Sequence, residues 1–158
     1  MTTEAMDGLT RTGGMVEVRL CKPSGPADAF GDFARLLARH RINMNVFIGT
    51  LVHGVNIVSC VSNADEDRLK DLTDSCPDLR GEVEWAGPVG LISVFPHRSS
   101  LKAVGSAITA LARAHIPMHG FCSSLSAVTF IIDQALQEKA LSALVECFEI
   151  PDAQIYSR

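Results

Sequence analysis

Two stretches of this chain resemble each other closely: LARHRINMNVF at residues 37–47 and LARAHIPMHGF at residues 111–121. They lie 74 residues apart, and the same offset aligns residues 29–78 with residues 103–152 without a gap. Twelve of these fifty columns are identical, where average composition gives about three. Because the match extends to both ends of the alignment at one offset, it indicates an internal repeat of one supersecondary unit.

Both copies predict the same order of elements, from alternating or β-branched strands and from helical spacing of apolar residues. The first copy predicts strand 15–21, helix 28–40, strands 42–51 and 55–61, a helix capped by Asn63, and a closing strand at 81–85. The second predicts strand 89–95, helix 100–115, strands 116–125 and 128–132, helix 136–148 capped by Asp133, and a closing strand at 153–156.

The order βαββαβ, found twice, determines the expected fold class. Because βαβ crossovers are right-handed, such a unit forms a four-stranded antiparallel sheet with both helices on one face. We therefore expect an α+β protein of two tandem ferredoxin-like domains at residues 15–86 and 87–158, joined by the linker 86–88. Residues 1–14 are expected to form a disordered polar tail, because they contain Asp7, Arg11 and a glycine pair and lack the apolar core of a signal peptide.

Composition excludes several classes of protein. The chain of 158 residues is 47% apolar and 20% charged, too apolar for disorder and too interrupted for a membrane span of about 20 residues. Its net charge of -4 opposes nucleic acid and anionic lipid as partners. The five cysteines are odd in number, form no CxxC pair and mostly lie in apolar runs. They are therefore expected to be reduced core thiols of a cytoplasmic protein.

The second copy resembles a known family along its whole length. The matching segments are GLISV at 90–94, the helix end and strand start at 111–118, Ser123-Ser124, TFIID at 129–133 and EKALSAL at 138–144. These segments resemble an ACT domain, and most closely the paired ACT domains at the C-terminus of aspartate kinases. The first copy matches more loosely, but Asn43 stands where the family has an asparagine.

The resemblance implies regulation by a small ligand, often a free amino acid, held at an interface between ACT domains. In aspartate kinases the effector lies between the loop after the first strand, with the helix that follows, and the start of the second strand. Free N–H groups and the positive end of the helix dipole suit a carboxylate at this place. The implied ligand-binding residues are Ser24, Gly25, Asp28, Asn43, Met44, His97, Arg98, Ser99, Ser100 and Met118.

Two departures from the family's pattern weaken the implication for the second copy. Neither copy has the Pro-Gly-Val/Ile that usually begins the first helix, and the second copy has Pro117 in the place of Asn43.

We therefore expect a non-catalytic regulatory protein that needs no cofactor and binds an amino acid at an ACT–ACT or dimer interface. Exposed sheet edges predict a homodimer, and regulation predicts an enzyme as a further partner. Two alternatives stay open: a ligand-independent dimerisation or interaction module, and a small ferredoxin-like enzyme.

Other chemistry is weakly indicated. His119 and Cys122 are three residues apart on an expected strand, so their side chains point to opposite faces and no metal site is expected with His115. Cys21 and His97 offer a Cys/His pair only if the fold brings them together. RNA binding on such a sheet requires stacked aromatic residues, and aromatic residues make up only 6% of this chain.

Overall fold

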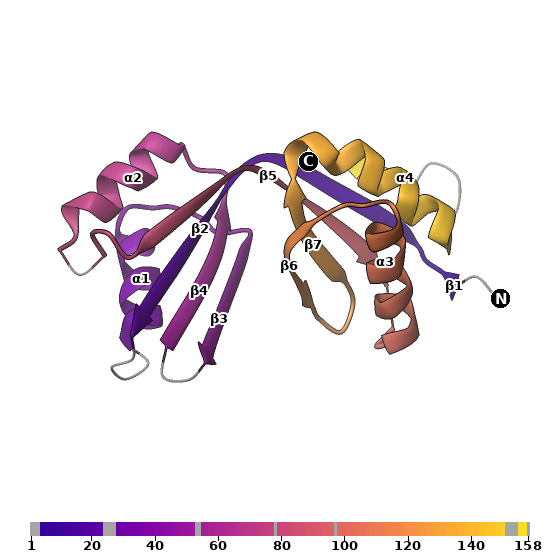
Figure 1. The fold of residues 1–158 in the computed structure, drawn as a ribbon, viewed down its shortest axis with the longest axis horizontal. Coiled ribbons are helices and arrows are strands. Elements are labelled where there is room, and N and C mark those ends of the chain that lie inside the picture. The colour runs from indigo at the N-terminus through magenta and orange to yellow at the C-terminus, as the bar shows by residue number, and fades with distance from the viewer. Residues whose placement is uncertain are drawn as a thin grey trace. The chain divides into compact units, whose positions relative to one another are not determined.

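The computed structural model describes residues 4–23, 28–52, 55–77, 79–96, 98–150 and 155–157. The chain divides into two compact units (Figure 1). Unit 1 consists of residues 1–14 together with residues 89–158, and unit 2 consists of residues 15–88. The two long strands β2 (Gly8–Pro23) and β5 (Val83–Phe95) contribute residues to both units.

Unit 2 contains α1 (Asp28–Arg39), β3 (Val46–Val52), β4 (Val55–Ser62) and α2 (Glu66–Ser75). Strand order is β3-β4-β2-β5, and β4 pairs antiparallel with both β2 and β3. Alternate residues of β2 form one core with both helices, so α1 and α2 cover the same face of the sheet. This core includes Val16, Val18, Leu20, Phe33, Leu37, Leu69 and Leu72.

Unit 1 contains α3 (Leu101–Arg113), β6 (Met118–Ser123), β7 (Val128–Asp133), the short helix η1 (Gln134–Leu136) and α4 (Gln137–Cys147). β7 pairs antiparallel with β5 and β6. Ile92 and Val94 of β5 form one core with residues of both helices, so α3 and α4 also cover a single face. The expected α+β class, with antiparallel sheet and helices, is confirmed.

The N-terminal residues correct one prediction, because residues 8–14 form the first part of β2 rather than a tail. β1 (Glu4–Ala5) pairs with β8 (Phe148–Glu149), and the Asp7 N–H donates to the Phe95 carbonyl at the end of β5 (2.9 Å). The physical reason is apolar burial: Met6 and Leu9 are 3% and 0% exposed and belong to the core of unit 1.

The C-terminal end corrects a second prediction. β9 (Ile155–Ser157) pairs in parallel with Leu9–Arg11 of β2, while β2 itself lies beside β5. The N-terminal strand therefore takes the place expected for the segment 153–156. The expected linker 86–88 lies inside β5, and the boundary between the units falls after Pro88.

Two helix caps also differ from expectation. Asp65, rather than Asn63, caps α2, and its Oδ1 accepts the N–H of Arg68 at 3.1 Å. Asp133 makes no capping bond to η1, and its Oδ1 lies 2.9 Å from Nε2 of His119. In the part of the chain described, no helix is long and apolar enough to cross a membrane.

Gln137 at the start of α4 fixes the N-terminal strand to unit 1. Its side chain is buried, and Nε2 donates to the carbonyls of Thr12 (3.0 Å) and Leu91 (3.3 Å). The space for this amide exists because residue 90 is glycine: a Cβ on Gly90 would lie 2.1 Å from Nε2. Gln134 adds a second bond, because its Oε1 accepts the N–H of Gly14 at 2.6 Å.

Candidate functional site

The loop between β5 and α3 carries part of the predicted site in unit 1. Arg98 and Ser99 have φ angles of 48° and 59°, so two consecutive residues adopt the left-handed conformation. Ser100 then caps α3, and its Oγ accepts the N–H of Ala103 at 3.1 Å. The Arg98 guanidinium is largely exposed and lies 3.9 Å from the Asp7 carboxylate. A cation beside a helix N-terminus can hold a carboxylate.

Met118, the other predicted residue of this unit that the structure describes, lies at the opposite end of the sheet. It pairs with Ile132, whereas Val94, next to the loop, pairs with Val128. Val128 and Ile132 are four residue steps apart on β7, and at about 3.3 Å per step this separates the loop from Met118 by about 13 Å. His97 is outside the described residues.

Unit 2 has the same arrangement. Asn43 and Met44 precede β3, whose first residue, Val46, pairs with Val61. Pro23, at the end of β2, pairs instead with Val55 at the other end of β4. Ser24 and Gly25 are outside the described residues, and of Asp28 only the backbone, as the first residue of α1, is described.

Asn43 and Met44 are nevertheless open to solvent. The Asn43 side chain is exposed, while its backbone carbonyl accepts a hydrogen bond from Oγ of Ser62 at 2.8 Å. Met44 is 37% exposed. The backbone is therefore fixed while both side chains face solvent.

In each unit, the end of the first strand and the start of the second lie at opposite ends of the sheet. The reason is general: the crossover helix returns the chain to the end of the sheet where the first strand began. This separation was open to sequence reasoning, since it follows from the element order alone.

The described residues supply little for metal or nucleophilic chemistry. Among them, no group of three or more His, Cys, Asp or Glu side chains could hold a metal ion. Burial raises the pKa of the Cys122 thiol above its ordinary value, and a hydrogen bond with Thr129 offsets this in part. A thiol with a raised pKa is a poor nucleophile at neutral pH. The side chains of Cys21 and His97 lie outside the described part.

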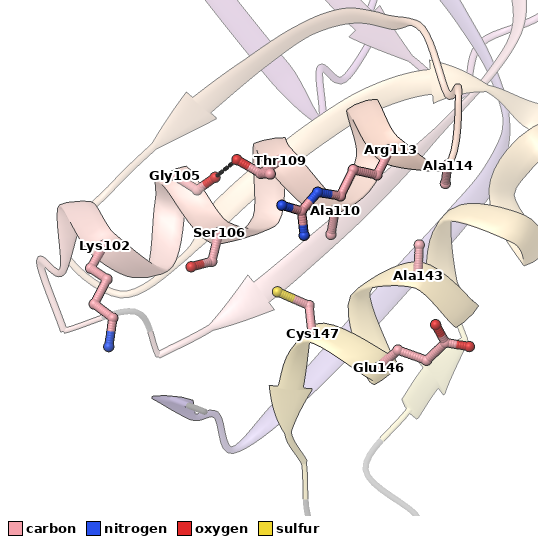
Figure 2. Close-up of a pocket in the computed structure, with 10 residues that line it drawn as sticks. All are labelled: Lys102, Gly105, Ser106, Thr109, Ala110, Arg113, Ala114, Ala143, Glu146 and Cys147. Atoms are coloured by element: carbon pink, nitrogen blue, oxygen red, sulfur yellow. Dashed lines mark hydrogen bonds between the residues drawn. The ribbon is translucent and has the colours of Figure 1, made fainter. Parts of the chain in front are cut away.

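Sequence reasoning missed one surface feature of unit 1. An open groove of about 760 Å³ runs between α3 and α4 (Figure 2). Small residues of α3 line it, including Gly105, Ser106 and Ala110. The available signal was the helical spacing of these small residues, which is also compatible with simple helix packing.

The two units together have the fold of the regulatory subunits of aspartate kinase, which are ACT-domain proteins. The predicted resemblance is confirmed at the level of the fold. No family model matches the sequence, and no curated protein matches it.

Particular structures give the extent of this similarity. The regulatory subunit from Thermus thermophilus, in a ligand-free form, aligns with a TM-score of 0.80 and 17% identity, over 92% of this chain and 100% of that one. A C-terminal regulatory domain of aspartate kinase from Porphyromonas gingivalis aligns with a TM-score of 0.69 and 16% identity, over 92% of this chain and 99% of that one.

A whole kinase shows the same fold in one part of its chain. Aspartokinase III of E. coli, in complex with lysine and aspartate, aligns with a TM-score of 0.68 and 16% identity. The alignment covers 94% of this chain and 34% of the kinase chain. This chain therefore spans about a third of that kinase.

Proposed function

We propose that this protein is a non-catalytic cytoplasmic regulator, built from two ferredoxin-like ACT domains, that binds a free amino acid at an ACT–ACT or dimer interface. The observation that carries the proposal is the fold similarity over 92% of the chain to regulatory subunits that are themselves covered completely. A structural neighbour, aspartokinase III of E. coli, is described in complex with lysine.

The geometry of the predicted residues supports an interface site. The loop at Arg98 supplies a cation and a helix N-terminus for the carboxylate of an amino acid. Asn43 supplies an exposed side-chain amide, which both donates and accepts hydrogen bonds. The loop and the start of the second strand lie at opposite ends of each sheet. A ligand therefore contacts a loop and a strand start together only where two ACT units adjoin.

A homodimer and a regulated enzyme complete the proposal. Strands β3 and β6 end the strand order of their units, so each leaves a row of backbone groups for pairing with another chain. A regulator without chemistry of its own acts only through a protein that it contacts, and we propose an enzyme in that role.

Thermal unfolding with each of the twenty amino acids and a set of nucleotides tests the proposal. A ligand at 100 times its Kd stabilises the folded chain by about 2.7 kcal/mol, which raises the midpoint by several degrees. The D-enantiomer of any amino acid that acts is the matched control, because it has the same charge and size. The absence of a shift with every amino acid at millimolar concentration would contradict the proposal.

A second candidate function is a dimerisation module that needs no ligand. It is favoured by the exposed aromatic residues Phe47 (38%) and Phe121 (45%), which occupy equivalent positions of the repeat in β3 and β6. Light scattering with and without amino acids separates the two. A dimer that responds to no metabolite supports the module, whereas a ligand-dependent mass or stability supports the sensor.

A further inference from the structure

An acidic and a basic side chain lie together at the end of β5 in unit 1. The Asp7 carboxylate and the Arg98 guanidinium are 3.9 Å apart, and 65% and 72% of these side chains are exposed. A charge-assisted hydrogen bond is shorter, at about 2.7–2.9 Å. Among the residues that the structure describes, neither charged group takes part in a hydrogen bond. Both charges are therefore accessible to a ligand.

The backbones that carry this pair are fixed, although the side chains are exposed. The Asp7 N–H donates to the Phe95 carbonyl at 2.9 Å, and the preceding residue, Met6, is buried in the core of unit 1. Arg98 lies in the short loop before α3, whose first turn is capped by Ser100. Two segments far apart in the sequence therefore present opposite charges at one place.

The internal repeat indicates that the fold does not require these charges. At the 74-residue offset, Asp7 and Arg98 correspond to Gly81 and Ser24. Unit 2 has the same order of helices and strands as unit 1, without either charge at these positions. Packing and topology therefore do not explain the pair in unit 1.

The ligand-binding residues predicted for the second copy lack an acidic side chain. Asp28, the acidic residue predicted for the first copy, corresponds to Lys102, and residues 97–100 and Met118 contain no carboxylate. A free amino acid has an ammonium group as well as a carboxylate, and a charged group that leaves water needs a partner. In unit 1, Asp7 is the acidic residue that the structure places beside the loop.

The spacing of the two charges suits a zwitterion. In an α-amino acid a single carbon joins the ammonium nitrogen to the carboxylate carbon, which is about 2.5 Å away. One such molecule can place its ammonium against Asp7 and its carboxylate against Arg98, each at hydrogen-bond distance. An exposed ion pair is weak in water, so little is lost when the two side chains adjust to a ligand.

We propose that Asp7 binds the α-ammonium group of the amino acid whose carboxylate binds Arg98. This contact selects free α-amino acids over carboxylic acids that have no ammonium group. The inference rests on the proposed function, because it names the residue that recognises one end of the proposed ligand. It also gives the N-terminal segment a role in binding.

Calorimetry on the full-length chain tests the assignment with two sets of probes. The first set is the twenty free L-amino acids, and the second is the corresponding carboxylic acids without the amino group. The wild-type chain should bind a free amino acid about tenfold more tightly than its deaminated counterpart. Asp7→Asn should weaken the free amino acid about tenfold and leave the deaminated acid unchanged, so that the preference disappears.

Three further variants are controls for this effect. Arg98→Asn should weaken both probes, because it removes the partner of the carboxylate, and asparagine tolerates the φ of 48° at this position. Asp7→Glu keeps the negative charge and should keep the preference. Asp74→Asn removes an exposed carboxylate of unit 2 and should change neither affinity. The urea midpoint of Asp7→Asn should equal that of the wild type, because asparagine retains the N–H bond to Phe95.

Two results would overturn the inference: an Asp7→Asn variant that binds both probes more weakly to the same extent, or one that keeps the preference of the wild type. Either result, obtained with an amino acid that binds the wild type, would leave the proposed function standing. If no amino acid bound the wild-type chain, the proposed function and this inference would both be refuted.

Discussion

Replacing Gly90 by alanine introduces a methyl group where a buried side chain already lies. The new Cβ would lie 2.1 Å from Nε2, 2.2 Å from Cδ and 2.7 Å from Oε1 of Gln137, far inside contact distance. Gln137 is the end of a flexible side chain, but it is 7% exposed and bonded to two backbone carbonyls. The amide must therefore move and lose the bonds to Thr12 and Leu91.

The expected cost follows from these two hydrogen bonds. Each contributes about 0.5–1.5 kcal/mol, and carbonyls left without a donor add to the loss. Alanine regains about 0.5–1 kcal/mol, because it restricts the unfolded chain more than glycine does. We expect Gly90→Ala to lower the free energy of unfolding by about 1–2 kcal/mol and to loosen residues 8–14.

Gly105→Ala is the matched control. This glycine lies inside α3, and a Cβ there would meet nothing within 4 Å. The same substitution should therefore stabilise the chain, by about 0.5–1 kcal/mol from helix propensity. The two glycine-to-alanine changes are thus expected to change the free energy of unfolding in opposite directions. A neighbouring side chain already fills the space for a Cβ at Gly90 but not at Gly105.

Urea unfolding followed by far-UV circular dichroism measures both variants, and a double-mutant cycle isolates the contact. In the background Gln137→Ala, the change Gly90→Ala should cost nothing, which gives a coupling energy of about 1–2 kcal/mol. Additive effects of the two substitutions, or a Gly90→Ala variant as stable as the wild type, would refute the reasoning.

Three further predictions concern the binding residues and the helices. In calorimetry, Asn43→Ala should weaken amino-acid binding more than His119→Ala does, because the His119 ring is already hydrogen-bonded to the Asp133 carboxylate. Equal affinities of the two variants would contradict the assignment of Asn43 to the binding site. Ser100→Ala should lower the free energy of unfolding by about 1 kcal/mol through loss of the α3 cap, and an unchanged urea midpoint would contradict this. The hydrogen bond to Glu66 raises the pKa of Lys70 above 10.5, so the stability from this pair is present below that pH and is lost as the pH rises through the folded-state pKa. NMR titration should show a lower Lys70 pKa in the variant Glu66→Gln than in the wild type. An unchanged Lys70 pKa would show that Glu66 does not raise it.

The repeat made most of the local structure predictable. The predicted strands and helices agree with β3, β4, β6, β7 and all four α-helices to within a few residues. Propensity and periodicity act over short distances, so each copy contains its own evidence. The caps were less accurate, because Asn63 and Asp65 are both competent residues and only the geometry of the chain selects Asp65.

The candidate site was only partly predictable. The family resemblance supplied the residue types, and the predicted element order implied that the two halves lie at opposite ends of each sheet. The sequence did not locate the open groove. Small residues at helical spacing indicate close packing as readily as an open surface, and only the positions of α3 and α4 distinguish the two.

The repeat, the α+β class and the likeness to paired ACT domains could all be predicted from the sequence, because they depend on residues close together in the chain. The strand that completes unit 1 depends on the tertiary structure. Residues 8–14 lie beside β5 and are held by Gln137, more than a hundred residues further along the chain. Strand pairing at such separation depends on which apolar side chains can be buried together and on the space that a glycine leaves. Met6, Leu9 and Gly90 meet those conditions only in the folded chain.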